Sequence, residues 1–167
     1  MRWIVLPLFL LSSTLFAQTE PTPREQAYAS FDALLGTWEI EAFFLDGTKF
    51  EQKFEIVRGV QGAVYKCTTW QKDDAGHYQL KSEGIRAWDE SARAMKFWDF
   101  GIDGTITTGS VAFDGENILY IYDYGGEILT DYFGFERDGL YEYIIGVKDG
   151  RQWPTLYCNG GVKRVTQ

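Results

Sequence analysis

Hydrophobic and polar residues alternate along most of the chain after Gly36. In the first such run, residues 38–44, the even positions are apolar, whereas Glu39 and Glu41 occupy odd ones. A period of two is typical of a β-strand with one face packed against a core. Runs of this kind predict about ten strands, at residues 38–44, 50–56, 63–70, 78–88, 94–100, 105–113, 117–124, 128–135, 140–147 and 155–165.

Short turn segments separate these runs. Asp-Gly or Gly-Gly pairs occur at residues 46–47, 103–104, 114–115, 125–126, 138–139 and 149–150. Asp-Gly between alternating strands is a strong hairpin signal, because tight hairpin turns need residues with positive φ. A long antiparallel meander removes its exposed edges when it closes on itself. The sequence therefore predicts an all-β, antiparallel up-and-down β-barrel.

One helix is expected before the first strand. Thr22 is a suitable N-cap and Pro23 a suitable first residue. Apolar residues then recur at helical spacing, at Ala27, Phe31, Leu34 and Leu35, and Gly36 follows as a stop signal. We expect this short N-terminal helix to lay its apolar face against the barrel.

The first 17 residues have the pattern of a secretory signal peptide. Arg2 precedes an apolar run at residues 3–11, and Ala17 offers a cleavage site before Gln18. The alternative is a retained membrane anchor, which the shortness of the run and Pro7 disfavour. We expect a signal peptide at 1–17, a tether at 18–24 and a single barrel domain at 25–167, located in the periplasm or secreted.

Composition and charge exclude several classes of protein. The chain has 167 residues, of which 45% are hydrophobic and 17% aromatic, too many for a disordered protein. Its net charge is −8, and loss of Arg2 with the signal peptide would make it −9. This charge disfavours partnership with nucleic acid or, after signal removal, with an anionic membrane. One His and two Cys are too few for a typical metal site, and no cofactor is expected.

Three segments resemble a known superfamily. Residues 31–39 (FDALLGTWE) resemble the helix-to-first-strand signature of calycins, which include lipocalins and fatty-acid-binding proteins. Residues 83–89 (EGIRAWD) and 96–99 (KFWD) extend the similarity to an uncharacterised, lipocalin-like bacterial family of the DUF1579 type. The resemblance spans nearly the whole chain after the tether. It implies a barrel with an interior cavity and an N-terminal plug helix, and it carries over no catalytic residue.

The resemblance also assigns structural roles. Gly36 and Trp38 belong to the opening signature, and in lipocalins the equivalent Trp closes one barrel end against a late Arg, matched here by Arg164. Haem-binding barrels of the nitrobindin kind share this opening but need an axial His on a late strand. The single His of this chain, His77, lies beside a turn, so we expect no haem.

Candidate binding residues are polar side chains set within aromatic strands. Asp99, Asp123 and Asp131 are of this kind, and alternation places Asp123 with Leu119 and Ile121. If those apolar faces point inward, the carboxylates need interior partners. The predicted ligand-binding set is Gln52, Lys66, Arg86, Trp98, Asp99, Tyr122, Asp123 and Asp131. The alternative is that the aspartates lie near strand ends or pair with surface Lys and Arg.

The two cysteines fall on the third and last predicted strands, which are not neighbours in a meander of this length. Separate buried thiols are therefore favoured over a disulfide between Cys67 and Cys158. A catalytic role for either is disfavoured, because His77 is the only histidine that could act as a base.

Binding of a small apolar or aromatic ligand in the interior is the function that this pattern favours. One alternative is an enzyme on the same barrel that uses interior aspartates as acid and base. Another is a filled barrel that acts through its surface. The sequence contains no Gly-x-Ser-x-Gly, His-Glu-x-x-His or phosphate-binding loop, so no residue is assigned a catalytic role.

Overall fold

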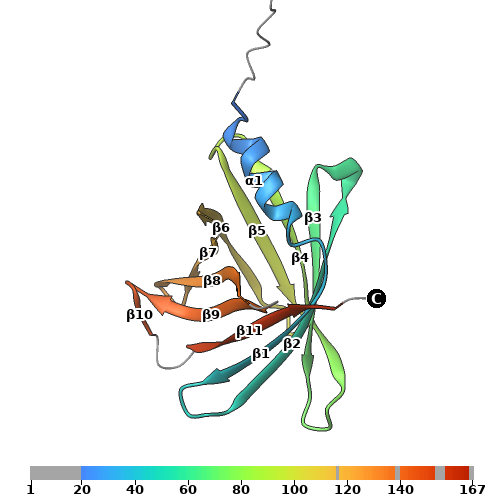
Figure 1. Cartoon of the computed structure of the whole chain (residues 1–167), viewed down its shortest axis with the longest axis vertical. Helices are drawn as coiled ribbons and strands as arrows, with labels where there is room; N and C mark the ends of the chain where they lie inside the picture. The colour runs from blue at the N-terminus through green and yellow to red at the C-terminus, as the bar shows by residue number, and fades with distance from the viewer. Residues whose placement is uncertain (1–19, 116, 138–139, 153–156, 166–167) are drawn as a thin grey trace, which may run out of the picture.

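A computed structural model of the chain describes residues 20–115, 117–137, 140–152 and 157–165. The signal peptide expected at residues 1–17 lies outside this part. The described chain contains one α-helix, one 3₁₀ turn and a set of antiparallel strands (Figure 1). Their bounds are α1 Pro23–Asp32, β1 Gly36–Phe44, β2 Lys49–Gly59, η1 Val60–Gly62, β3 Val64–Lys72, β4 Tyr78–Asp89, β5 Ala94–Gly101, β6 Ile106–Asp114, β7 Asn117–Tyr124, β8 Glu127–Arg137, β9 Leu140–Lys148, β10 Arg151–Gln152 and β11 Cys158–Arg164.

The strands form one closed sheet. Each strand from β1 to β9 pairs with the next, and β11 lies between β9 and β1. The seam is long: β1 and β11 pair from Trp38 opposite Arg164 to Phe44 opposite Cys158. The strand expected at 155–165 corresponds to β11. The two residues of β10 precede it and form an additional short strand that also pairs with β9. The predicted ten-stranded up-and-down barrel is confirmed.

Helix α1 lies against one end of the barrel (Figure 1). The side chain of Thr22 accepts a hydrogen bond from the backbone N–H of Glu25, and the Glu25 carboxylate accepts one from the backbone N–H of Thr22. The helix ends at Asp32, earlier than the spacing of its apolar residues predicts. Leu34 and Leu35 lie in a tight turn instead, and Gly36 begins β1 with φ +117°, a conformation that residues with a Cβ rarely adopt.

The barrel end next to α1 is closed by an interlocked group of side chains. Trp38 is fully buried and donates from Nε1 to the carbonyl oxygen of Leu34 over 2.8 Å. Arg164 lies over the Trp38 ring with 4.4 Å between guanidinium carbon and ring centroid. The same guanidinium donates to the carbonyl oxygens of Ala33 and Leu35, at 2.6 and 2.9 Å. The expected contact between Trp38 and Arg164 is therefore present, and it also holds the turn after α1.

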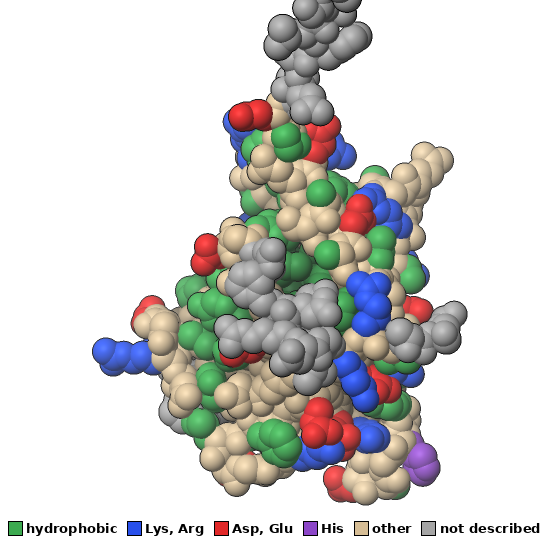
Figure 2. Space-filling model, in the orientation of Figure 1, with side chains coloured by type: hydrophobic (Ala, Val, Ile, Leu, Met, Phe, Trp, Pro, Cys, Tyr) green, Lys and Arg blue, Asp and Glu red, His purple; other side chains and the backbone are tan. Residues whose placement is uncertain are grey.

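Burial follows the alternation expected for the first strand. Trp38, Ile40 and Ala42 are buried, whereas Glu41 is exposed. Acidic and basic side chains are interspersed on the face of the molecule drawn in Figure 2. Within the described residues, the structure has no helix with the length and apolar character needed to cross a bilayer.

Candidate ligand-binding cavity

The barrel encloses a cavity of about 370 Å³. This volume lies within the range of small-molecule sites, which begins at roughly 300 Å³. The interior is therefore not filled by its own side chains. Eight of the described residues that line it are aromatic and come from five strands: Phe54, Phe97, Tyr120, Tyr122, Tyr124, Tyr132, Phe133 and Tyr143.

The cavity extends along the barrel from the α1 end toward the opposite rim. Leu34, in the turn after α1, lines its inner end. Lys81, Thr105 and Tyr124 line its other end, where they are exposed near the hairpins that join β3 to β4, β5 to β6 and β7 to β8. A ligand would therefore enter from the rim that faces away from α1.

The first polar group in the cavity is an ion pair between Arg86 of β4 and Asp99 of β5. Nη1 and Nη2 of Arg86 donate to Oδ1 and Oδ2 of Asp99 over 2.5 and 2.9 Å. Arg86 is only 5% exposed, and its guanidinium carbon lies 5.4 Å from the ring centroids of both Phe97 and Tyr120. Both carboxylate oxygens are engaged, so the two charges compensate each other. Nε of Arg86 is buried and has no hydrogen-bond acceptor among the described residues.

The second polar group centres on Asp131 of β8. The Tyr122 hydroxyl lies 3.1 and 3.2 Å from the two oxygens of this carboxyl, and the backbone N–H of Gly146 donates to Oδ1 over 2.9 Å. Thr130 pairs with Val147 but Tyr132 pairs with Ile144, so β9 holds one extra residue at this point. Such a bulge releases a backbone N–H from the strand ladder. Gly146, with φ +72°, lies in this bulge and turns its N–H toward Asp131.

Burial sets the protonation of this second group. It raises the pKa of Asp131 to about 7, although the hydrogen bonds from Gly146 and Tyr122 act in the opposite direction. Burial, together with the nearby Asp131 charge, also raises the pKa of the Tyr122 and Tyr143 hydroxyls far above their usual range. Asp131 therefore exchanges its proton near neutral pH, while the surrounding tyrosines stay neutral donors.

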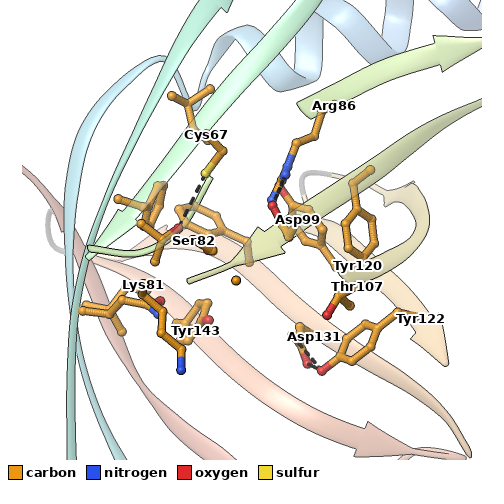
Figure 3. Close-up of a pocket in the computed structure, with 18 of the residues that line it drawn as sticks. Cys67, Lys81, Ser82, Arg86, Asp99, Thr107, Tyr120, Tyr122, Asp131 and Tyr143 are labelled. Atoms are coloured by element: carbon orange, nitrogen blue, oxygen red, sulfur yellow. Dashed lines mark hydrogen bonds and ion pairs between the residues drawn. The ribbon is translucent and has the colours of Figure 1, made fainter. Parts of the chain in front are cut away.

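The two polar groups face the same cavity (Figure 3). Asp99 pairs across the sheet with Thr107 of β6, and Tyr122 lies on β7, the next strand. Arg86, Asp99, Thr107, Tyr122 and Asp131 thus come from five consecutive strands, β4 to β8, and form one polar side of the cavity.

Five of the eight predicted binding residues line this cavity: Gln52, Arg86, Asp99, Tyr122 and Asp131. The expectation for Asp123 was wrong. On β7, Tyr120 and Tyr122 face the cavity, so Asp123 is exposed and accepts a hydrogen bond from the N–H of Gly126 in the following turn. Both faces of this strand carry large apolar side chains, so alternation alone does not indicate the inner one.

Lys66 and Trp98 also lie outside the cavity. Lys66 is exposed and follows Tyr65, whose side chain is fully buried. Trp98, 37% exposed, lies between two residues that line the cavity, Phe97 and Asp99. Successive side chains of a strand point to opposite faces of the sheet, so neither residue can reach an interior carboxylate.

Sequence reasoning missed Lys81, Thr107 and Tyr143. Lys81 is the extra residue of a bulge, because Thr69 pairs with Ser82 while Trp70 pairs with Leu80. Lys81 and Ser82 both line the cavity because of this bulge. Simple alternation would place only one of these two neighbours on the inner face of the strand. For Thr107, alternation with the apolar residues Val111 and Phe113 of the same strand was an available signal, whereas the bulge at Lys81 becomes visible only in the strand pairing.

Of the remaining reactive groups, Cys67 lines the cavity, with its thiol sulfur 3.9 Å from the hydroxyl of Thr69, whereas Cys158 and His77 are not among the lining residues. Cys67 and Cys158 are buried, free thiols, as expected, and burial raises the pKa of both, that of Cys158 to about 12. His77 lies on the β3–β4 turn with a largely exposed side chain. Within the described part of the chain, no three His, Cys, Asp or Glu side chains are grouped closely enough to hold a metal ion.

Comparison with known proteins adds little to this geometry. No family model and no curated protein sequence matches the chain. Among solved structures, a redesigned β-barrel matches over 82% of this chain and 96% of its own, with 11% identity and a TM-score of 0.45. Nothing about a ligand or a reaction follows from this similarity.

Proposed function

We propose that this protein is an exported, lipocalin-like barrel that binds a small, largely aromatic or apolar molecule in its interior. The observation that carries the proposal is the cavity of about 370 Å³, lined by aromatic rings and a few convergent polar groups. Sites for small molecules have this composition, because apolar walls supply affinity and a few polar groups fix orientation. A filled barrel acting through its surface fits this interior less well.

The lipocalin-like and DUF1579-type assignment is part of the same proposal. It is supported by the helix that precedes β1 and by the stacking of Arg164 on Trp38 at the closed end. Export rests on the pattern of residues 1–17. Expression of the full chain in a Gram-negative bacterium, followed by fractionation and N-terminal sequencing, tests it. Mature protein in the periplasm that begins at Gln18 would support export, and retention of Met1 in the cytoplasm would contradict it.

An enzyme on the same barrel is the second candidate. Asp131 favours it, because a carboxyl with a pKa of about 7 that lines a cavity is suited to general acid–base chemistry. Asp99 is less suited, because both of its oxygens are held by Arg86. Among the described residues no nucleophile is aligned with Asp131, and a single titrating carboxyl fits ligand orientation better than catalysis, so we rank binding first.

Binding in the interior is tested with a neutral fluorescent probe, N-phenyl-1-naphthylamine, and a pair of matched variants. Thr107 lines the cavity, whereas Thr108 is the exposed next residue of β6. Thr107→Phe inserts a ring into the cavity, and Thr108→Phe adds the same ring outside. We expect the wild type and Thr108→Phe to bind the probe with similar affinity and Thr107→Phe to bind it at least tenfold more weakly.

Native mass spectrometry of gently purified protein provides an independent readout. A co-purified small molecule that Thr107→Phe lacks and Thr108→Phe retains would identify the natural ligand class. Equal probe affinity for the two variants, or no probe binding by folded wild type, would contradict an interior site.

A further inference from the structure

We propose that the cavity selects organic ammonium ions with an aromatic or apolar body, and that the Asp131 carboxylate is their counter-ion. This inference rests on the proposed interior binding function and adds the charge of the ligand to it. It is argued from the charges that face the cavity, the hydrogen bonds of Asp131 and the rings around it.

The cavity contains one carboxylate without a cationic partner. Arg86 and Asp99 neutralise each other through two hydrogen bonds. An anionic ligand would have to displace Asp99 to gain the terminal nitrogens of Arg86, which would leave the partly buried Asp99 carboxylate without its cationic partner. Asp131, by contrast, accepts hydrogen bonds only from neutral groups among the described residues, the Tyr122 hydroxyl and the Gly146 N–H.

The titratable groups that face Asp131 are acids. They are Tyr122 on β7, Tyr143 on β9 and Cys158 on β11. Each stays neutral near pH 7 because burial raises its pKa, so none can compensate a negative charge on Asp131. Lys81 also lines the cavity, but it is exposed at the rim and makes no hydrogen bond or ion pair with Asp131 among the described residues. A positively charged ligand would supply the cationic partner that the Asp131 carboxylate lacks among the described residues.

The carboxyl group also has room for a further donor. Oδ1 receives the Gly146 N–H and shares the Tyr122 hydroxyl, whereas Oδ2 receives only that shared hydroxyl, over 3.2 Å, among the described residues. A carboxylate oxygen accepts two hydrogen bonds readily, so Oδ2 can take the N–H of an ammonium group.

Aromatic rings complete a cation site. Tyr122, Tyr132, Phe133 and Tyr143 line the cavity on the strands β7, β8 and β9 that surround Asp131. The faces of such rings attract ammonium groups, and their edges and faces pack equally well against an aromatic ligand body. The net charge of −8 on the whole chain further favours the approach of cations over anions.

The experiment compares three probes of similar size: 2-phenylethylamine, 2-phenylethanol and 3-phenylpropionate. Each is titrated against wild-type protein, with displacement of N-phenyl-1-naphthylamine as the readout, at pH 6 and pH 8. With a pKa of about 7, the ionised fraction of Asp131 rises about tenfold over this interval, whereas an alkylammonium stays protonated. We expect the amine to bind about tenfold more tightly at pH 8 than at pH 6, and the alcohol to change little.

Matched variants localise the effect. Asp131→Asn should remove both the preference for the amine over the alcohol and the pH dependence of amine binding. Binding of the alcohol and of the dye should stay unchanged. Asp123→Asn, an exposed aspartate of β7, should leave the preference intact. The comparison of amine and alcohol in wild-type protein at the two pH values is a test that needs no variant, so it does not depend on how Asp131→Asn folds.

Each result separates this inference from the proposed function. If the dye binds but the amine competes no better than the alcohol at pH 8, or if the carboxylate competes best, the ammonium site is wrong and the binding function stands. If folded wild-type protein binds neither the dye nor any probe, the proposed function fails, and this inference fails with it.

Discussion

Gly84 and Asp99 lie opposite each other on β4 and β5, and the carboxylate of Asp99 occupies the space that a side chain on residue 84 would need. A Cβ on residue 84 would lie 1.8 Å from Oδ1 of Asp99 and 2.5 Å from Nη1 of Arg86. Both distances are far inside van der Waals contact. The ion pair between Arg86 and Asp99 therefore requires glycine at position 84.

Gly84→Ala should separate Arg86 from Asp99. The backbone oxygen of Trp98 lies 2.6 Å from the same Cβ position, so the strand cannot yield easily. Because breaking a buried ion pair leaves uncompensated charges, we expect a loss of roughly 3 kcal/mol in the free energy of unfolding. Urea denaturation followed by tryptophan fluorescence measures it.

Gly59→Ala is the matched control for this substitution. Its Cβ would meet the flexible side chain of Lys66 first, at 3.3 Å, and the exposed chain can move aside. We expect a change within about 0.5 kcal/mol. Similar losses for the two variants would contradict a specific role for Gly84 in holding the ion pair.

Asp131 should make the protein less stable as the pH rises toward neutrality. Its pKa in the folded state is about 7, above the ordinary aspartate value of 3.8, so between these values the folded chain holds a proton that the unfolded chain has lost. Stability therefore falls with rising pH across this window. Asp131→Asn removes the titrating group, and we expect it to gain on the order of 2 kcal/mol relative to wild type between about pH 5 and pH 8. Thermal unfolding of both proteins across this range measures the difference, and parallel curves would refute the shifted pKa.

Although Arg164 is exposed, its side chain should contribute substantially to the free energy of unfolding. Arg164→Ala would remove two hydrogen bonds to the turn after α1 and the stacking on Trp38. We expect a loss of roughly 2 kcal/mol. Lys163→Ala, next along β11, removes only an exposed contact with Glu39 at 3.4 Å and should cost less than about 0.5 kcal/mol. Equal losses in chemical denaturation would show that the closed end does not depend on Arg164.

Both cysteines should be unreactive in the folded protein. The thiolate is the nucleophile in reaction with Ellman's reagent, and burial both raises the thiol pKa and blocks access. We expect negligible reaction near pH 8 in buffer and two thiols per chain in guanidinium chloride without reductant. Fewer than two thiols in the unfolded chain would indicate a disulfide and contradict the separation of Cys67 from Cys158.

Much of the architecture was predictable from local patterns. Period-two alternation located the strands, and Asp-Gly pairs located most of the hairpins, because these features depend on residues adjacent in sequence. The alternation around Trp38 gave the correct inner face of β1, since acidic residues occupy the other face. Arg86 and Asp99 were both among the predicted binding residues, because a buried carboxylate needs a cation or hydrogen-bond donors, but their pairing with each other was not predicted.

The sequence by itself determined that this chain builds hairpins, closes them into a barrel and places polar groups among aromatic strands. Only the tertiary structure decided which of those groups meet. On β7 both faces are apolar, so the orientation that sends Tyr122 inward and Asp123 outward follows from the neighbouring strands. The bulges at Lys81 and Gly146 likewise arise from the strand register, and the pKa of Asp131 near 7 arises from burial among residues distant in sequence. Local patterns fix conformation, whereas closure of the barrel fixes contacts and solvation.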